Sequence, residues 1–166
     1  DQALTICEAF MYLYHPQFIE LQKVVDEKTI GEVSSLRSRF GLPSLGKPGF
    51  RYTKNLGGSC LLDVGSYPIS AVHALFGSRE IIVLTGRINE FGKGGVDLGG
   101  CTVLEVEDGP VCYLEWSYNK GYVNDIDLWG DKGSIFTDKI FSKNSELEPR
   151  FSLRDVHGEL KTTIGN

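Results

Sequence analysis

The chain has 166 residues, of which 41% are hydrophobic and 23% charged, and its formal net charge is −5. This length suits one domain with a substantial core, and this composition excludes a disordered chain. The negative charge gives no electrostatic reason to bind nucleic acid or an anionic membrane, and no apolar run approaches the ~20 residues of a membrane-spanning helix.

An apolar, strand-like run, ALTICEAF at residues 3–10, lies at the N-terminal end of the chain. No methionine begins the chain, and residues 4–8 have the pattern of a short strand. We therefore expect a piece cut from a longer protein, and a processed complete chain is the alternative.

The chain contains four cysteines without CxxC spacing: Cys7, Cys60, Cys101 and Cys112. Because no secretory leader precedes them, we expect reduced core thiols in a cytoplasmic protein rather than two disulfides. The three histidines, His15, His73 and His157, share no metal-ligand spacing with these cysteines. The sequence therefore predicts no metal site.

The first half of the chain alternates between helix and strand patterns. Apolar residues recur at helical spacing after Pro16, a residue suited to the first turn of a helix, which predicts a helix over residues 16–28. Residues 31–41 predict a strand, and the Pro- and Gly-rich residues 41–58 predict a long loop, which in a compact domain is usually functional or mobile. Residues 60–76 predict a second helix, apolar almost all round and therefore buried on more than one side.

From residue 81 onward the pattern changes to strands. Five strand-like segments follow one another, at residues 81–89, 101–107, 111–118, 122–130 and 134–142. Turn sequences such as Asp108-Gly109 separate neighbours, and short turns join antiparallel strands. We predict an α+β fold with an open, mainly antiparallel sheet and helices packed on one face.

The glycines of residues 92–100 lie between two predicted strands. They do not form the GxGxxG fingerprint that precedes a helix in dinucleotide-binding folds. The sequence therefore predicts a hairpin loop there and no cofactor-binding residues in this chain.

The segment at residues 111–118 predicts two different sheet faces. Its alternation puts one set of side chains on one side, Cys112, Leu114, Trp116 and Tyr118, and another set on the other, Val111, Tyr113, Glu115 and Ser117. If the first set meets the helices, Val111 and Tyr113 face outward. An apolar outer face favours homo-oligomerisation through the sheet, although scattered exposed apolar residues are normal.

Asp63 is the one carboxylate within the second predicted helix. Tyr67 lies four residues later, on the same helical face, and Asp63 falls in the first turn, where the helix dipole favours negative charge. Gly57 and Gly58 just before it allow another backbone or a ligand to approach closely. An unpaired carboxylate in so apolar a helix would be costly, so Asp63 has a partner or faces a wet cleft. The alternative is that Asp63 caps its own helix and Tyr67 packs against the sheet.

Several stretches occur in a recognisable order: EAFMYLYHPQF at 8–18, IGEV at 30–33, LGGSCLLDVGSYPIS at 56–70, ALFG at 74–77 and GDKGSI at 130–135. With these motifs the chain resembles the C-terminal domain of the glucose–fructose oxidoreductase / inositol dehydrogenase (Gfo/Idh/MocA) family. In that family an N-terminal Rossmann domain binds NAD(P). The C-terminal domain supplies the substrate cleft and an open sheet that often forms the subunit interface.

The resemblance implies catalytic roles for Asp63 and Tyr67, which match the family's Asp-x-Gly-x-His/Tyr positions. Tyrosine at the second position is similar to the glucose–fructose oxidoreductase and dihydrodiol dehydrogenase branches. The family's third residue, the lysine of a Glu-Lys-Pro motif, belongs to the N-terminal domain, and this tripeptide does not occur in the 166 residues. Relatives usually carry an arginine between Met and His-Pro, where this chain has Leu13 and Tyr14.

The resemblance also implies a cofactor and a domain seam. NAD or NADP would serve the parent protein, this chain alone would bind none, and residues 1–9 would be the tail of an N-terminal dinucleotide-binding domain. Glu8 and Tyr12, at that seam, and Arg51, in the long loop, would contact the substrate, although a solvated loop charge is the alternative for Arg51. A tyrosine needs a neighbouring cation to act as a base near neutrality, and the family's lysine would supply it.

We therefore predict one substrate-binding and oligomerisation domain, residues 1–166, of an NAD(P)-dependent oxidoreductase acting on a sugar, polyol or diol hydroxyl. The chain would be inactive alone, and its partners would be a small-molecule substrate and further copies of itself. The alternative is a non-catalytic carbohydrate-binding or sheet-mediated dimerisation module. Replacing Asp63 with asparagine would abolish turnover in the first case and preserve function in the second.

Overall fold

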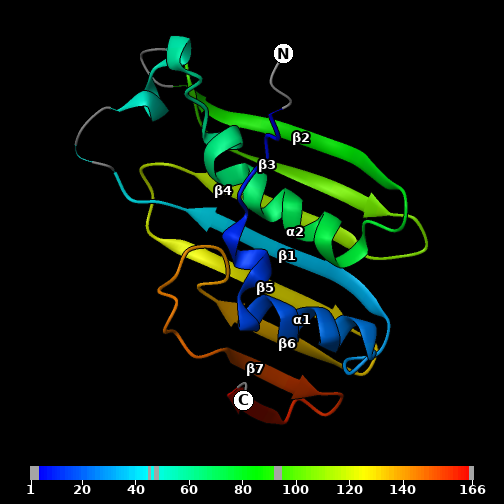
Figure 1. Cartoon of the computed structure of the whole chain (residues 1–166). Helices are drawn as coiled ribbons and strands as arrows, with labels where there is room; N and C mark the ends of the chain where they lie inside the picture. Colours follow the sequence, from blue (N-terminus) through cyan, green and yellow to red (C-terminus); the bar gives the residue numbers. More distant parts are fainter. Residues whose placement is uncertain (1–3, 45, 47–48, 92–94, 165–166) are drawn as a thin grey trace.

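Two helices lie on one face of an eight-stranded sheet in the computed structural model, which describes residues 4–44, 46, 49–91 and 95–164 (Figure 1). The helices are α1 (Pro16–Asp26) and α2 (Ser66–Phe76). The strands are β1 (Val33–Gly41), β2 (Ile81–Phe91), β3 (Asp97–Val106), β4 (Val111–Ser117), β5 (Val123–Gly130), β6 (Gly133–Asp138), β7 (Arg150–Asp155) and β8 (Leu160–Ile164). The predicted α+β class with helices on one face is confirmed.

The sheet has the strand order β2-β3-β4-β1-β5-β6-β7-β8. All neighbours pair antiparallel except β1 and β4, which are parallel. The five predicted strand segments correspond to β2–β6, and β7 and β8 extend the sheet beyond them. The glycine-rich link joins β2 to β3 as a hairpin, and residues 92–94 of it lie outside the described residues.

Helix α1 begins where the sequence predicts. His15 is its N-cap, and its Nδ1 accepts a hydrogen bond of 3.1 Å from the backbone N–H of Gln17. Pro16 takes the first helical position, where its missing N–H has no cost. Phe18 and Leu21 are fully buried and hold the helix on the sheet. A short 3₁₀ helix, η1 (Met11–Tyr14), precedes it.

The second predicted helix begins as a π-helical turn, η4 (Leu61–Gly65), and continues as α2. Gly65 allows this turn to lie on the sheet, because a Cβ there would be only 2.8 Å from the Trp116 ring. Turns of this kind are frequent at functional sites. Burial on more than one side was expected for this helix; Cys60, Val64 and Val72 are buried, whereas Leu62 is 69% exposed.

The core lies between the helices and the sheet. The predicted alternation of β4 is confirmed, because one set of its side chains is buried, Cys112, Leu114, Trp116 and Tyr118. Tyr113 faces outward and is 45% exposed. Cys60 and Cys112 are buried as expected, whereas Cys7 is exposed, so it is not a core thiol. A cytoplasmic location stays a prediction.

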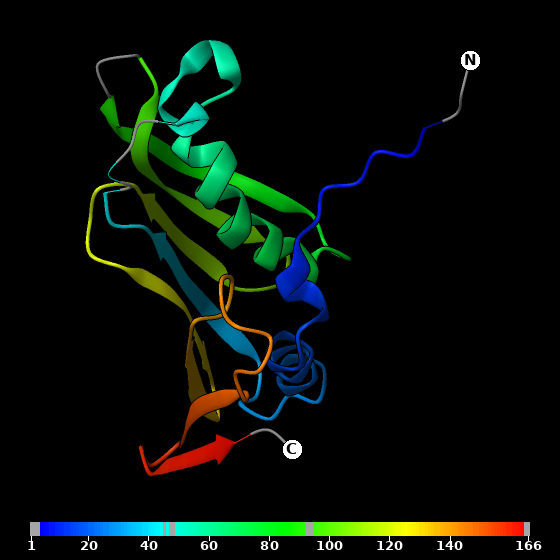
Figure 2. The same cartoon turned by 60° about the vertical axis from the view of Figure 1, so that its left-hand side comes forward.

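The strand predicted at residues 4–8 is wrong. These residues are extended but pair with no strand of the described chain, and Ile6 is 95% exposed. Figure 2 shows the segment before η1 running outward from the helix-covered face. An apolar run forms a strand only where a neighbour accepts its hydrogen bonds, and none of the eight described strands pairs with it.

The predicted long loop contains two 3₁₀ helices, η2 (Phe50–Tyr52) and η3 (Lys54–Leu56). Residues 45, 47 and 48 lie outside the described residues. The loop leads directly into η4, so it lies beside the start of the second helix (Figure 1). Neither α1 nor α2, among the residues described, is long and apolar enough to cross a bilayer.

Candidate active site

Asp63 lies in η4, close to where the chain enters the helix. Two other side chains cap the free N–H groups of this turn: Asp97 Oδ2 accepts from Leu61 N at 2.7 Å, and Ser59 Oγ accepts from Leu62 N at 3.1 Å. No backbone N–H of the described residues donates to the Asp63 carboxylate, which bonds two side chains instead. The alternative in which Asp63 caps its own helix is therefore wrong, and its carboxylate is available for other contacts.

The Asp63 carboxylate has two strong donors. Its Oδ2 accepts from Arg51 Nε and from the Tyr118 hydroxyl, each at 2.6 Å. Hydrogen bonds to a charged oxygen are shorter and stronger than neutral ones. No described residue donates to the other oxygen, Oδ1, and the side chain keeps 25% of its surface exposed. Asp63 is thus fixed through one oxygen and open through the other.

Tyr118 holds Asp63 from inside the core. It is fully buried at the end of β4, and its ring lies 5.4 Å from that of Tyr52. Burial, and then its hydrogen bond to Asp63, raise the pKa of Tyr118, so it remains a proton donor. Sequence reasoning missed this residue as part of the site. The available signal was its place on the helix-facing side of β4, because a buried tyrosine hydroxyl usually has a partner.

Arg51 reaches Asp63 from η2, where its guanidinium lies 4.8 Å from the centre of the Phe50 ring. The hydrogen bond to Asp63 raises the pKa of Arg51. Gly58 makes this approach possible, because a Cβ there would lie 2.6 Å from the carbonyl oxygens of Phe50 and Arg51. The close approach predicted at the two glycines is therefore made by the chain's own backbone, and Gly57 adds a left-handed turn at φ +80°.

Tyr67 lies one turn beyond Asp63, surrounded by rings. Ring centres lie 5.1 Å away for Phe10, 5.3 Å for Phe40, 5.8 Å for Phe141 and 5.9 Å for Tyr12. No described residue forms a hydrogen bond with its hydroxyl. Burial raises the pKa of Tyr67, the charges of Asp63 and Glu8 raise it further, and Arg51 opposes them. In this chain Tyr67 is therefore a proton donor near neutrality and needs a further cation to become a base.

The other two predicted site residues take different positions. Tyr12 is 2% exposed, its hydroxyl hydrogen-bonds Ser70 Oγ at 2.6 Å, and burial raises its pKa to about 12. Tyr12 therefore packs against the Tyr67 ring from within the core. A contact between Tyr12 and the substrate stays a prediction. Glu8 is exposed and acts on Tyr67 through its charge. The fold thus brings Arg51, Asp63 and Tyr67 together, with Glu8 nearby.

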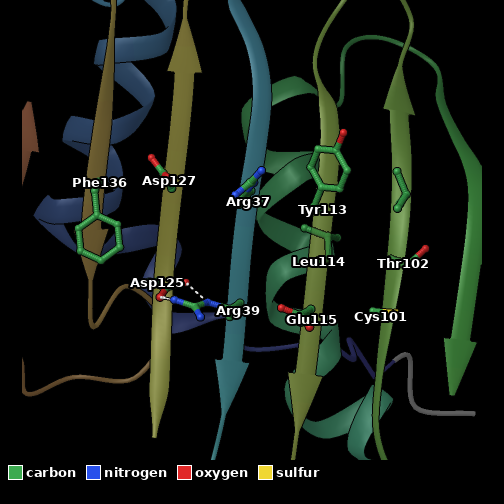
Figure 3. A pocket seen from close by; sticks show the side chains of 11 residues that line it. Arg37, Arg39, Cys101, Thr102, Tyr113, Leu114, Glu115, Asp125, Asp127 and Phe136 are labelled. Atoms are coloured by element: carbon green, nitrogen blue, oxygen red, sulfur yellow. Dashed lines mark hydrogen bonds and ion pairs between the residues drawn. The ribbon is translucent and has the colours of Figure 1, made fainter. Parts of the chain in front are cut away.

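The opposite face of the sheet carries a hollow of about 530 Å³ across β3, β4, β1, β5 and β6, lined by both charged and apolar side chains (Figure 3). Arg39 and Asp125 form a bidentate ion pair there, with Nη2–Oδ2 at 2.6 Å and Nε–Oδ1 at 3.3 Å. Arg37 lies over the Tyr113 ring at 5.7 Å, and burial raises the pKa of Asp127. The sheet separates this hollow from Asp63. In the described part of the chain, no group of three or more His, Cys, Asp or Glu side chains is placed to hold a metal ion.

The helix-covered face therefore presents a carboxylate held by Arg51 and Tyr118, with Tyr67 one turn further along the same helix. The sequence profile of the GFO/IDH/MocA C-terminal domain matches residues 18–136. The chain belongs to this family.

Several relatives have named activities. The dTDP-3,4-didehydro-2,6-dideoxy-alpha-D-glucose 3-reductase of Saccharopolyspora spinosa is 33% identical over 146 residues, 87% of this chain and 43% of that protein. The D-xylose 1-dehydrogenase (NADP(+)) 2 of Haloferax volcanii is 31% identical over 72% of this chain and 36% of its own length. The chain thus spans less than half the length of these relatives.

A solved structure gives the same fold. The crystal structure of a 3-ketoreductase from Actinomadura kijaniata, in complex with NADP and TDP-benzene, superposes with a TM-score of 0.90 at 25% identity. The match covers 97% of this chain and 49% of that one. The family fold is therefore present here over almost the whole chain.

Proposed function

We propose that this chain is the substrate-binding domain of an NAD(P)-dependent oxidoreductase that interconverts a hydroxyl and a keto group on a sugar. The observation that carries the proposal is the Asp63 carboxylate, fixed by Arg51 and Tyr118 and open at Oδ1, beside a tyrosine without a hydrogen-bond partner among the described residues. The relatives named above favour a sugar linked to a nucleoside diphosphate and NADP as cofactor.

Each site residue has a role in this reaction. In ketone reduction the Tyr67 hydroxyl donates a proton to the carbonyl oxygen, and in alcohol oxidation it takes the proton back. Oδ1 of Asp63 accepts a hydrogen bond from a sugar hydroxyl or from a lysine of the adjoining domain. Nicotinamide, when bound, supplies or accepts the hydride. This chain lacks a GxGxxG turn before a helix, so we assign the cofactor to a preceding domain.

Exposed apolar side chains support a covering domain on the helix side. Six of them are on the segments before α1 and around η3 and η4: Leu4, Ile6, Met11, Tyr14, Leu56 and Leu62. Grouped apolar exposure of this kind marks an interaction surface. The extended residues 4–9 fit the tail of such a domain, and residues 1–3 lie outside the described residues.

The direct test is hydride transfer. We expect the full-length protein to oxidise NADPH in the presence of a nucleotide-linked keto sugar, with the loss of NADPH absorbance as the readout. The purified 166-residue chain should give no such signal, because it lacks the cofactor fold. Turnover by the 166-residue chain alone, or none by the full-length protein across nucleotide-linked and free sugars, would contradict the proposal.

We also propose that the outer sheet face joins two copies of this chain. The hollow there carries both charge signs, with Arg37 and Arg39 facing Asp125 and Asp127, so two copies related by a twofold axis could present opposite charges to each other. Two exposed aromatic side chains line it, Tyr113 at 45% and Phe136 at 40%. Aromatic residues and arginine are enriched at such interfaces.

Replacing Arg37 with glutamate should separate the two copies. The change replaces a positive charge with a negative one beside Glu115, Asp125 and Asp127 on both sides of the interface. Like charges across an interface are strongly unfavourable. Light scattering should report twice 18.4 kDa for the parent chain and 18.4 kDa for the variant. Lys132→Glu, in the exposed β5–β6 turn, is the matched control and should leave the mass unchanged. A monomeric parent chain would refute this interface.

A further inference from the structure

Two nitrogen donors, one at the N-cap of α1 and one in the loop after β6, have no acidic partner in the described chain. His15 Nδ1 accepts the N–H of Gln17, so the ring proton of a neutral His15 is on Nε2. That Nε2 is buried, and no described residue accepts a hydrogen bond from it. A buried N–H without an acceptor is costly, and native structures rarely contain one unless a ligand or water completes it.

Lys143, in the loop after β6, supplies the second donor. Its ammonium donates to Gln17 Oε1 and to the carbonyl oxygen of Ile140, both at 3.0 Å. Both acceptors are neutral, and no carboxylate of the described residues forms an ion pair with it. Burial lowers the pKa of Lys143 to about 8, as expected for an ammonium held without a counter-charge.

Gln17 fixes the two donors together. It is 1% exposed, and its amide nitrogen is held by the Thr137 hydroxyl and the carbonyl oxygen of Asp138, the latter at 2.9 Å. Both side chains bond Gln17, His15 through the backbone N–H and Lys143 through Oε1. Burial, and then the Lys143 charge, lower the pKa of His15. The positive end of the α1 dipole adds to the field at this point. The result is a preorganised pair of donors that favours an anion.

This pair adjoins the candidate active site. The loop after β6 lies beside η1 and the start of α1 in both views (Figures 1 and 2). Phe141, two residues before Lys143, has its ring centre 5.8 Å from Tyr67 and 5.1 Å from Tyr12. The loop that carries Lys143 therefore packs through Phe141 against the aromatic side chains around Tyr67.

We propose that His15 and Lys143 form a subsite for a phosphoryl group carried by the substrate or the cofactor. The inference rests on the nucleotide-linked sugar and the NADP proposed above, since both bring phosphoryl groups to this face. A phosphoryl oxygen would accept from His15 Nε2 and from the remaining N–H of Lys143, which satisfies both donors at once.

The test is equilibrium binding of inorganic pyrophosphate to the full 166-residue chain, by calorimetry. Lys143→Gln keeps a donor for Gln17 but removes the charge, and His15→Asn keeps the N-cap acceptor but removes the Nε2 donor. Each should weaken pyrophosphate binding by roughly 10–100-fold, the range for one charge-assisted hydrogen bond. Lys139→Gln, an exposed lysine of the same loop, is the control and should bind like the parent chain. Thermal melts establish that all three variants are folded.

Two nucleotides distinguish the source of the phosphoryl group. If Lys143→Gln weakens the binding of thymidine diphosphate more than the binding of 2′,5′-ADP, the subsite holds the substrate diphosphate. If it weakens the binding of 2′,5′-ADP more, the subsite holds the 2′-phosphate of NADP. Absence of pyrophosphate binding, or equal affinity in Lys143→Gln and Lys139→Gln, would overturn the subsite. Because binding needs no turnover, this failure would leave the oxidoreductase proposal standing, and an inactive full-length protein would leave the subsite standing.

Discussion

Replacing Tyr67 with phenylalanine should lower kcat of the full-length protein by roughly 10²–10⁴-fold, the usual contribution of a general acid–base group. The Tyr67 ring packs against Phe10 and Phe40, so phenylalanine fills the same space. No described residue is bonded to the lost hydroxyl, so the fold and the melting temperature should be unchanged. Steady-state NADPH oxidation, with melting curves beside it, measures both effects.

The pH profile gives a second readout of the same variant. In ketone reduction Tyr67 must carry its proton, so the rate falls as pH rises through its pKa. Burial and the charges of Asp63 and Glu8 raise that pKa in this chain, which moves the fall to alkaline pH, and a lysine from an adjoining domain would move it back. The alkaline fall should disappear in Tyr67→Phe.

A matched control is Tyr122→Phe, which removes the same hydroxyl from a tyrosine that is 51% exposed and bonded to Ser142 and Asn124 rather than to a site residue. It should leave both kcat and the pH profile unchanged. A Tyr67→Phe enzyme with nearly the parent kcat would remove Tyr67 from the proton transfer and return the site to a binding role.

Local sequence pattern predicted most of the fold because each strand's faces are decided by its own residues. The alternation through Cys112, Leu114 and Trp116 identifies the buried face of β4 without any knowledge of its neighbours. Strand pairing is different. Ser38 of β1 lies between Leu114 of β4 and Ile126 of β5, and nothing near Ser38 in sequence encodes either partner.

The error at residues 4–8 has the same origin. Leu4 and Ile6 are apolar enough for a strand, but a strand also needs a free edge to pair with, and sequence pattern does not report edges. In the proposed parent protein a second domain would cover these side chains. Their exposure here is therefore consistent with a seam.

Sequence pattern likewise identified some residues of the candidate site but not the partners that they contact. Asp63 was recognisable because a carboxylate in an apolar helix calls for a partner, and the resemblance pointed to Tyr67. The identity of that partner depended on packing between distant elements. Tyr118 meets Asp63 only because η4 lies on β4, and Arg51 meets it only because Gly58 lets η2 close on the helix start.

The second large effect is expected for Asp63→Asn. Asparagine keeps the shape but removes the charge that binds Arg51 and orients the reacting group through Oδ1. We expect kcat/KM of the full-length protein to fall by roughly 10²–10⁴-fold. Stability should fall by only about 1 kcal/mol, because the Arg51 side chain is 37% exposed and water can replace its lost partner. Kinetics and chemical denaturation measure the two separately.

This variant also separates the two hypotheses for the domain. Asp26→Asn, on the exposed end of α1, is the control and should match the parent protein. A catalytic domain predicts lost turnover with ligand binding largely retained, because Arg51 and Tyr118 stay in place. A non-catalytic module predicts that Asp63→Asn behaves like Asp26→Asn in every assay. In that second case the hydrogen bonds to Asp63 would serve only to anchor the η2 loop to the helix, and the proposed chemistry would have to be given up.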